Sequence, residues 1–421
     1  MATKIGFVSL GCSKNLVDTE MIIGYYKNKG YEIVADVNEA EIIVINTCGF
    51  IEAAKQEAID TILEMADYKV EGNCKKLVVT GCLVERYEEE LKKELPEVDL
   101  FVPIRDYDKI FEKLEYKERE ISTGNNYAYL KIAEGCSNNC TYCAIPLIRG
   151  PYISRKYEGI IEEAKQLEQK GIKELIVIAQ DTTKYGIDLY GKGRLPELLQ
   201  DLCKLNFKWI RFLYSYPESI TDELIKVVKN NPKICNYFDI PIQHISDSVL
   251  KRMGRRTTGG NIRNIIKKIK QEIPDVILRT SLIVGFPGET EENFKELKEF
   301  VKEAKFNRLG VFKYSKEDGT PAVKLRPHLD AKTKEKRYKE IMKEQQKVSK
   351  ENNNELIGKE IECMIEGITE DGEYYISRSY MDVPNEDGLV FVEKEKTYQS
   401  GDFTKVDIIE ALEYDLIARE K

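Results

Sequence analysis

The clearest chemical signal in the sequence is a group of three cysteines, Cys136, Cys140 and Cys143, in the segment EGCSNNCTYCAIPLIRG. Their C-x3-C-x2-C spacing puts three thiolates within eight residues. Three thiolates can ligate three irons of a cube and leave the fourth iron without a protein ligand. The spacing therefore predicts an iron–sulfur cluster with one iron open to a small molecule.

Two other interpretations of these cysteines remain. A zinc site would usually need two close cysteine pairs, or a pair combined with nearby histidines. The chain has only two histidines, His244 and His328, and neither lies near the group. A chance grouping is the second alternative, and with ten cysteines in 421 residues it is expected roughly once in two hundred such sequences.

A second set of cysteines follows three apolar runs that predict buried parallel strands. The runs lie at 5–10, 42–46 and 77–80. Cys12, Cys48 and Cys82 come just after them, each beside a small residue. Because the carboxyl ends of parallel strands meet at one edge of a sheet, we expect these thiols to converge on a second metal cluster. Three buried structural cysteines would explain each position singly but not their matching places.

The elements around this second set predict a small doubly wound α/β domain over residues 1–116. Helical patterns at 15–28, 52–68 and 84–94 separate the apolar runs. A polar stretch at about 116–126 marks the boundary to the next domain. Cys74 lies in a polar loop and fits neither cysteine group.

From Tyr127 onward the pattern of strand and helix starts again. Predicted strands lie at 129–133, 174–180, 209–215, 237–243, 276–285 and 309–315, with helical patterns between them. This series predicts a partial (β/α)6 barrel over residues 122–354, with its active face at the carboxyl ends of the strands. The polar residues expected to line that mouth are Gln180, Asp181, Ser215, Tyr216, Gln243, His244 and Pro287–Glu289. Each of them singly is more often a turn or capping residue, and we interpret Cys203 and Cys235 as packing residues.

The last segment, 355–421, alternates short strands with Gly, Asp and Asn turns, which predicts a small antiparallel β-barrel. It has 18 Asp and Glu against 7 Lys and Arg, a net charge of 7 − 18 = −11. The whole chain carries −8, so the remainder is +3.

The overall composition limits which classes of protein the chain can belong to. A chain of 421 residues with 42% hydrophobic and 33% charged residues is typical of a globular protein of two or three domains. No apolar run reaches the length of a membrane span, and the N-terminus has no export signal. Ten cysteines in such a chain predict a reducing cytoplasm and metal or catalytic roles rather than disulfides. Nothing in the sequence suggests an obligate oligomer, so we expect a monomer.

Several long motifs together resemble the radical S-adenosylmethionine (SAM) methylthiotransferases over essentially the whole chain. The motifs are SLGCSKNLVDTE, INTCGFI, TGC, LKIAEGCSNNCTYCAIPLIRGPY, VGFPGET and FKYSKEDGTPA. The resemblance implies three domains: the N-terminal domain of that family, a radical SAM core and a terminal TRAM domain. GCSKNLVDTE, CGFIEAAKQEAID and CAIPLIRGPY resemble most the branch that modifies an aspartate of small-subunit ribosomal protein S12, rather than the branch that modifies adenosine in tRNA.

The resemblance also implies roles for both cysteine groups. Cys136, Cys140 and Cys143 would hold a [4Fe–4S] cluster whose open iron binds SAM, which one electron cleaves to a 5′-deoxyadenosyl radical. Cys12, Cys48 and Cys82 would hold an auxiliary [4Fe–4S] cluster that carries the sulfur, so that each product consumes two SAM molecules. Asp181, Gln243, Gly285 and Gly288 are the candidates for SAM contacts. The electron donor and the sulfide source would be separate partners.

Charge bears on the choice of partner. A TRAM barrel that grips tRNA should be basic, because phosphate contacts dominate nucleic-acid affinity. The acidic segment 355–421 instead favours a Lys- and Arg-rich ribosomal protein and argues against tight nucleic-acid binding, although acidity can also serve solubility alone. A different class of function, a non-catalytic iron–sulfur or zinc RNA-binding factor, would show no SAM turnover.

Overall fold

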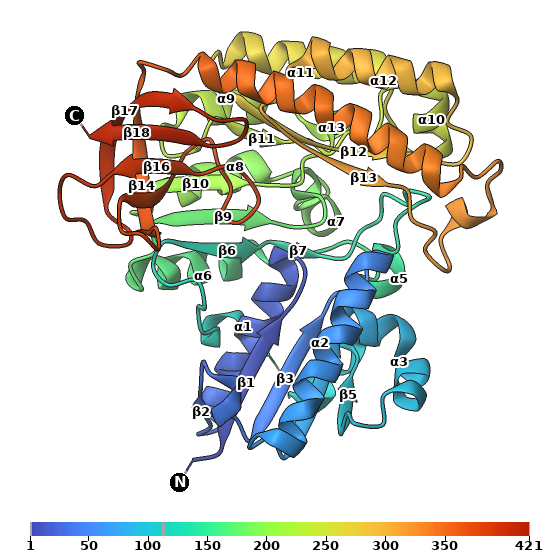
Figure 1. Cartoon of the computed structure of the whole chain (residues 1–421), viewed down its shortest axis with the longest axis vertical. Helices are drawn as coiled ribbons and strands as arrows, with labels where there is room; N and C mark the ends of the chain where they lie inside the picture. The colour runs from blue at the N-terminus through green and yellow to red at the C-terminus, as the bar shows by residue number, and fades with distance from the viewer. Residues whose placement is uncertain (1, 112–113, 421) are drawn as a thin grey trace.

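The computed structural model describes residues 2–111 and 114–420. Figure 1 shows an N-terminal α/β part at the bottom, a central α/β barrel above it and a small β-barrel at the upper left. The order along the chain is therefore α/β, then barrel, then β-barrel, and this confirms the predicted fold class.

The N-terminal part is built on a parallel sheet with the strand order β2-β1-β3-β4-β5. The strands are β1 (Lys4–Ser9), β2 (Glu32–Ile33), β3 (Ile42–Thr47), β4 (Lys76–Gly81) and β5 (Leu100–Val102). The helices are α1 (Ser13–Asn28), α2 (Glu52–Glu71), α3 (Cys82–Glu94) and α4 (Tyr107–Ile110). The three longest strands and helices lie where the sequence predicts them, and the short strands β2 and β5 were missed.

The central part has six parallel strands within the described residues, arranged as two sheets of order β10-β9-β6 and β11-β12-β13. The strands are β6 (Tyr127–Lys131), β9 (Glu174–Ile178), β10 (Trp209–Phe212), β11 (Tyr237–Asp239), β12 (Ile277–Val284) and β13 (Arg308–Lys313). A single parallel bridge, Ile210 to Ile234, joins the two sheets. A short antiparallel pair, β7 (Ala133–Glu134) and β8 (Ile153–Ser154), flanks the cysteine loop.

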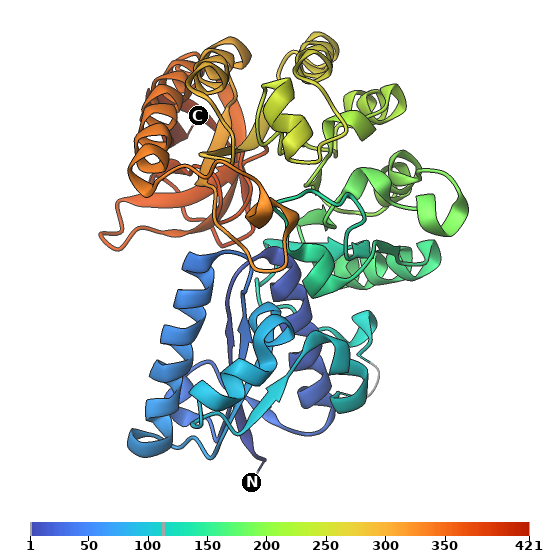
Figure 2. The same cartoon turned by 90° about the vertical axis from the view of Figure 1, so that its right-hand side faces the viewer.

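Helices cover the outer face of this barrel, as Figure 2 shows from the side. The helices of this part are α6 (Tyr157–Gln169), α7 (Ile187–Tyr190), α8 (Leu195–Leu202), α9 (Asp222–Asn230), α10 (Asp247–Arg252), α11 (Gly259–Glu272), α12 (Glu291–Ala304) and α13 (Ala331–Asn354). The short helix α5 (Ile145–Arg149) lies instead in the cysteine loop, beside the N-terminal part. Successive residues of a strand point to opposite faces. Ala128 and Leu130 of β6 therefore pack in the core under the outer helices, whereas Tyr129 between them faces inward.

The C-terminal part is a closed barrel of order β14-β15-β16-β18-β17. Its strands are β14 (Glu360–Ile368), β15 (Tyr374–Ser379), β16 (Val390–Glu393), β17 (Phe403–Ala411) and β18 (Leu416–Glu420). The sequence predicts four of these strands, β14 to β17, and β18 is the addition. Because β18 pairs in parallel with β16, the barrel is not antiparallel throughout as the sequence predicts. Closure removes the exposed strand edges that a short open sheet would present.

This small barrel is docked against the inner face of the central barrel. Its apolar core forms one cluster with inward residues of the central strands, among them Tyr129 and Trp209, and with Val17 of α1. The fully buried Glu174 of β9 accepts from Arg211 of β10 at 2.7 Å and pairs with Arg378 of β15 at 2.8 Å. Buried charges are tolerated only when they are paired in this way, so this network fixes how the small barrel sits.

Candidate active site

The cysteine loop lies at the carboxyl end of β6 and is held by backbone hydrogen bonds. Cys136 N–H donates to the Gly150 carbonyl at 3.1 Å, which closes the loop at its base. Thr141 N–H donates to the carbonyl of Met253 at 2.9 Å. Cys136 and Cys140 are buried and Cys143 is half-buried. The loop is thus anchored on both sides, and its three thiols are shielded from bulk water.

The environment of these thiols suits metal ligation. Burial raises the pKa of Cys143 to about 12, opposed by the backbone N–H of Ile145 and reinforced by Cys140 and Cys136. Burial also raises the pKa of Cys136, opposed by the backbone N–H of Asn138. A metal centre deprotonates its thiol ligands outright, and backbone N–H groups pointing at sulfur stabilise such clusters. The donor set therefore fits an iron–sulfur cube.

Asp181 is the mouth residue most closely tied to this loop. It is fully buried, and its Oδ2 accepts from Asn138 Nδ2 at 2.8 Å. Its backbone carbonyl accepts from the Tyr152 hydroxyl at 2.8 Å. Burial raises the pKa of Asp181, with the hydroxyl of Thr183 and the amide of Asn138 opposing. These contacts make Asp181 a support of the cysteine loop, and a direct contact with SAM stays a prediction.

Gln243, Gly285 and Gly288 are in different surroundings. Gln243 has a positive φ of 68°. Its backbone N–H donates to the carbonyl of Ser281 in β12 at 2.9 Å. A Cβ at Gly285 would lie 2.4 Å from Cγ of Lys334, and one at Gly288 would lie 2.5 Å from the guanidinium carbon of Arg252. Both glycines have a positive φ, 73° at Gly285 and 82° at Gly288, which favours glycine at each position. Their role in binding SAM stays a prediction.

The second cysteine set is brought together at the carboxyl edge of the N-terminal sheet. Cys12 precedes α1, Cys48 follows β3 and Cys82 begins α3. Gly11 has φ of 85°, and a Cβ there would lie 2.7 Å from Cβ of Cys48, so only glycine permits this approach. Burial raises the pKa of Cys82 to about 12, with Arg149 opposing and with Cys12 and Cys48 acting in the same direction as burial.

Arg149, at the end of α5 in the cysteine loop, links the two sets. Its Nη2 donates to Asn15 Oδ1 at 2.6 Å and to Cys82 Sγ at 3.5 Å, and its Nη1 donates to Asp18 Oδ2 at 2.5 Å. Cys82 also packs with Ala144 and Ile148 in one small apolar cluster. Since Ala144 follows Cys143 directly, the two cysteine sets face each other across the domain interface.

The end of β10 provides a second link. The hydroxyl of Tyr216 lies 3.7 Å from Cys140 Sγ. Tyr214 has a positive φ of 61°, a strained conformation for a tyrosine, and its ring lies 3.3 Å from Lys14 Nζ. Lys14 is two residues from Cys12. Burial lowers the pKa of Lys14, with Cys12, Glu386 and Asp239 opposing.

The remaining mouth candidates do not reach either cysteine set through a described contact. His244 is fully buried, and its Nδ1 accepts from the backbone N–H of Ser246 at 3.0 Å. Glu289 Oε2 accepts from the N–H of Gly285 at 2.6 Å and so closes the turn after β12. Ser215 N–H donates to the Asp239 carbonyl at 2.8 Å. These residues shape the mouth.

Among residues 2–111 and 114–420, no group of three or more His, Cys, Asp or Glu side chains is placed to hold a single metal ion. The ligands of a cube bind separate irons and stand further apart than the ligands of one ion, so this finding bears on single-ion sites only. In the same part of the chain, no helix is both long and apolar enough to cross a membrane.

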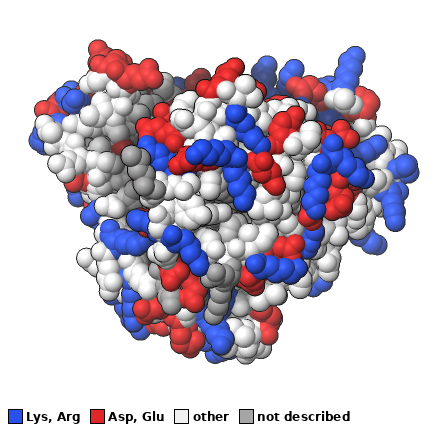
Figure 3. Space-filling model, turned by 90° about the horizontal axis from the view of Figure 1, so that it is seen from below, with Lys and Arg blue, Asp and Glu red and all other residues white. Residues whose placement is uncertain are grey.

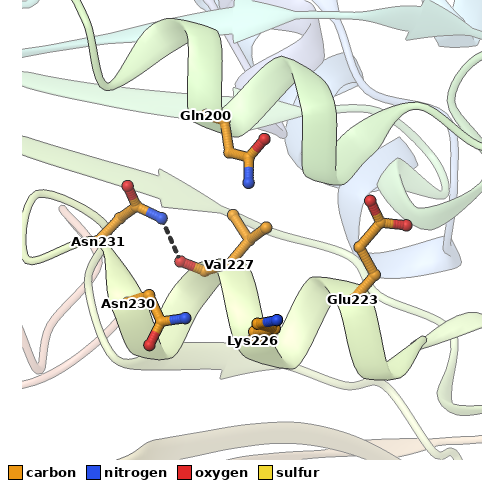
Figure 4. Close-up of a pocket in the computed structure, with 6 residues that line it drawn as sticks. All are labelled: Gln200, Glu223, Lys226, Val227, Asn230 and Asn231. Carbon is orange, nitrogen blue, oxygen red and sulfur yellow. Dashed lines mark hydrogen bonds between the residues drawn. The ribbon is translucent and has the colours of Figure 1, made fainter.

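A surface hollow of about 190 Å³ lies between α8 and α9, and its lining residues belong to neither cysteine set (Figure 4). Its lining includes Gln200, Lys226 and Asn231, and Asn231 Nδ2 donates to the Val227 carbonyl at 2.6 Å near the end of α9. Its lining residues include no cysteine or histidine.

Comparison with known proteins agrees with this geometry. Residues 130–301 match the radical SAM superfamily, residues 4–103 match a family described as uncharacterized protein family UPF0004, and residues 357–420 match the TRAM domain. Among solved structures, the chain is similar to the radical SAM methyltransferase TsrM from Kitasatospora setae, with a TM-score of 0.55 and 11% identity over 76% of this chain and 77% of that one. This likeness supports the fold alone.

A partial parallel barrel with a C-x3-C-x2-C loop at its mouth, together with these matches, defines a radical SAM enzyme. The chain is 59% identical to the ribosomal protein uS12 methylthiotransferase RimO of Alkaliphilus oremlandii and 53% identical to that of Clostridioides difficile, over 98% of this chain and 98% of each relative. The chain belongs to the RimO family of radical SAM methylthiotransferases.

Arg149, Asn15 and Lys14 are the site residues that sequence reasoning missed. All three lie inside motifs that carry the resemblance, CAIPLIRG and GCSKN. A signal was present, since each is a polar residue close to a cysteine that was already singled out. Their partners, however, lie in other domains, and only the fold brings them together.

Proposed function

We propose that this enzyme adds a methylthio group to the β-carbon of an aspartate in ribosomal protein uS12, using two [4Fe–4S] clusters and two SAM molecules per product. The observation that carries the proposal is the juxtaposition of the two cysteine sets through Arg149 and the cluster of Cys82, Ala144 and Ile148. A radical formed at one set and sulfur held at the other must meet at one carbon atom, and this arrangement supports such a meeting.

Each cysteine set has a separate task in the proposal. Cys136, Cys140 and Cys143 hold the cluster that binds SAM, and Cys12, Cys48 and Cys82 hold the cluster that carries sulfur. When bound, the clusters and SAM supply one-electron cleavage, hydrogen abstraction from an unactivated carbon, and the CH3S group. The protein holds these groups at fixed positions relative to one another and keeps water from the reacting carbon.

The chain's other side chains fit this division of labour. His244 is buried and His328 packs against Tyr314, so neither histidine is placed for acid–base chemistry at the cysteines. Asn138 and Lys184 hold the cysteine loop against Asp181. Removing a proton from a carbon beside a carboxylate would need a far stronger base than any side chain here, and this supports the radical route.

The names of the relatives support uS12 as the substrate, and charge agrees. The segment 355–421 has a net charge of −11, and Glu370, Asp371 and Glu373 are exposed together at the turn before β15. On the face seen in Figure 3, basic and acidic side chains are interspersed without a continuous basic tract. A basic ribosomal protein suits such a surface better than an RNA backbone does.

Some of these acidic side chains, however, form ion pairs inside the protein. Asp382 pairs with Arg308 of β13, and Glu386 and Asp387 pair with Arg279 of β12. These carboxylates neutralise arginines of the central barrel, so only the exposed ones are free to attract a partner.

The test is anaerobic reconstitution of the full chain, followed by reaction with SAM, sulfide and a one-electron reductant. Purified uS12 and tRNA are supplied in parallel, and the mass of each is measured. We expect about eight irons and eight sulfides per chain, release of 5′-deoxyadenosine, and a methylthio mass gain on uS12 only. A mass gain on tRNA alone would refute uS12 as the substrate. About four irons per chain would refute the second cluster.

A further inference from the structure

Lys14 of α1 is a buried cation that forms no salt bridge with any residue of 2–111 or 114–420. Lys14 is 4% exposed, and its Nζ lies 3.3 Å from the centre of the Tyr214 ring. Within the described part of the chain, no carboxylate or carbonyl oxygen accepts a hydrogen bond from Nζ. A buried ammonium is costly unless an anion pairs with it, and the ring supplies only part of that stabilisation.

A second lysine at the same interface shows what full pairing looks like. Lys131 of β6 is 2% exposed, and its Nζ donates to Asp18 at 2.5 Å and to Glu134 at 2.7 Å. Among the described residues, one buried lysine here is thus paired with two carboxylates and the other with none. The difference indicates that Lys14 receives its anion from outside the chain.

The carboxylates nearest Lys14 are already engaged. Asp239 Oδ2 accepts from the backbone N–H of Tyr214 at 2.9 Å, and its Oδ1 lies 3.6 Å from Arg279. Glu386 pairs with the same arginine. Neither makes a hydrogen bond to Lys14, although both contribute to its electrostatic surroundings.

Lys14 is connected to both cysteine sets through short stretches of chain. It is two residues from Cys12, which is exposed to solvent and therefore reachable. Its ring partner Tyr214 is two residues from Tyr216, whose hydroxyl lies 3.7 Å from Cys140. An anion bound at Nζ would sit beside the sulfur-carrying set and next to the strand end that contacts the radical-forming set.

We propose that Lys14 binds the side-chain carboxylate of the substrate aspartate and thereby presents its β-carbon between the two cysteine sets. The inference rests on the proposed function and adds the residue that selects the acidic side chain. A neutral amide or a nucleobase would leave the ammonium unpaired, so the same residue would discriminate against both. SAM also has a carboxylate, and the experiment must separate the two sources.

The experiment compares Lys14→Met with Lys14→Arg and Lys27→Met in reconstituted full-length enzyme. Methionine keeps the length of the buried stem and removes the charge, and arginine keeps the charge. Lys27, on the same helix, is exposed and pairs with Glu120, so Lys27→Met is the matched control. Binding of uS12 is measured by anisotropy, with the natural target aspartate and with asparagine in its place.

We expect wild type and Lys27→Met to bind the aspartate form at least about tenfold more tightly than the asparagine form, as loss of a buried charge pair predicts. Lys14→Met should bind both forms equally and weakly, and Lys14→Arg should regain part of the preference. SAM affinity, iron and sulfide content and the thermal midpoint should match wild type in every variant. These readouts separate lost recognition from lost folding.

Three outcomes would overturn the inference. If wild type modifies uS12 and Lys14→Met keeps the full preference for aspartate, only the role of Lys14 fails. If Lys14→Met loses SAM affinity while its uS12 preference is unchanged, the carboxylate bound is that of SAM. If wild type neither binds nor modifies uS12, the proposed function fails as well.

Discussion

Single residues in this site act across domain boundaries. Arg149 follows Cys143 by six residues, yet its guanidinium contacts Asn15, Asp18 and Cys82 of the N-terminal part. The sequence predicts six cysteines as cluster ligands, three from their local spacing and three from their places after predicted strands, and the fold brings the second three together as expected. Their role as ligands stays a prediction. The contacts of Arg149 could not be predicted, since they join residues more than sixty positions apart. The same holds for Lys14 and Tyr214.

Replacing Cys12 by alanine tests the division of labour between the two sets. On the proposed assignment, we expect Cys12→Ala to cleave SAM but to form no methylthio product, because only the set proposed to carry sulfur loses a ligand. Iron should fall from about eight toward about four per chain. Product is followed by mass spectrometry and SAM cleavage by 5′-deoxyadenosine release.

Cys74→Ala is the control for this substitution, because Cys74 is buried in the apolar core between sheet and helices of the same domain. It should keep both iron content and product formation. Normal product formation by Cys12→Ala would refute the assignment of the second set.

His244 should make stability depend on pH. Burial lowers the pKa of His244 to about 3, with Arg337 acting in the same direction. The unfolded chain binds this proton near pH 6.5 and the folded chain does not, so stability is full above pH 6.5 and falls as the pH drops toward 3. The stability difference between wild type and His244→Asn should shrink by about 1.4 kcal/mol per pH unit below pH 6.5.

The measurement is denaturant unfolding of both proteins from pH 7.5 to pH 5. The side-chain oxygen of asparagine can still accept the hydrogen bond that the backbone N–H of Ser246 donates to Nδ1 of His244. The substitution should therefore have few effects other than loss of the titrating group. A difference that stays constant over this range would show that His244 takes up no proton on unfolding.

At the scale of elements, α1 is the helix that holds the domains together. Its buried residues include Lys14, Asn15, Asp18 and Glu20 as well as Val17 and Ile22. A surface helix would show one apolar face and one polar face, but α1 is covered on both sides. The sequence predicts this helix correctly. Its mixed pattern of polar and apolar residues does not indicate which polar residues are buried, because their partners come from β6, α5 and the segment before β6.

The Asp18 and Arg149 pair should be a large part of this interface. Arg149→Met leaves the buried Asp18 with Lys131 as its one remaining cationic partner among the described residues, and removal of one member of a buried pair costs about 3–5 kcal/mol. We expect the unfolding free energy to drop by an amount near the lower end of that range. Asp18→Asn combined with Arg149→Met should cost less than the sum of the two single changes.

Denaturant unfolding of the four proteins provides the double-mutant cycle. Additive costs would mean that the two side chains do not interact in solution. Lys27→Met on the same helix should change stability by less than about 1 kcal/mol, as expected for an exposed ion pair.

At the scale of the whole molecule, the small barrel is part of the core rather than an appended module. The sequence predicts four of its five strands and its charge, because alternation and turn residues are local. It gives no indication that the barrel packs inside the central one, since Glu174, Arg211 and Arg378 show their relation only once both barrels are folded. The limits of the sequence prediction therefore lie in how domains pack and not in which domains exist.

Deleting residues 355–421 should therefore do more than remove a docking surface. The truncated chain would expose Tyr129, Trp209 and other inward apolar residues, and would leave Arg279 and Arg308 without their carboxylates from the small barrel. We expect aggregation and binding of an apolar dye, measured by size-exclusion chromatography and fluorescence. A monomeric truncated chain with normal SAM cleavage would contradict this.

The docking of the small barrel also sets an order of events during synthesis. The strand β13 ends at Lys313, whereas β18, which completes the small barrel, ends at Glu420. At translation rates of 5–20 residues per second, roughly 5–20 s pass between the two. During that interval all six cysteines have already been made, while the inner face that the small barrel covers, at the amino ends of the central strands, is still exposed. If the cysteines hold clusters as proposed, iron and sulfur delivered then would meet a central barrel that is open at this end, and completion of the small barrel would close it.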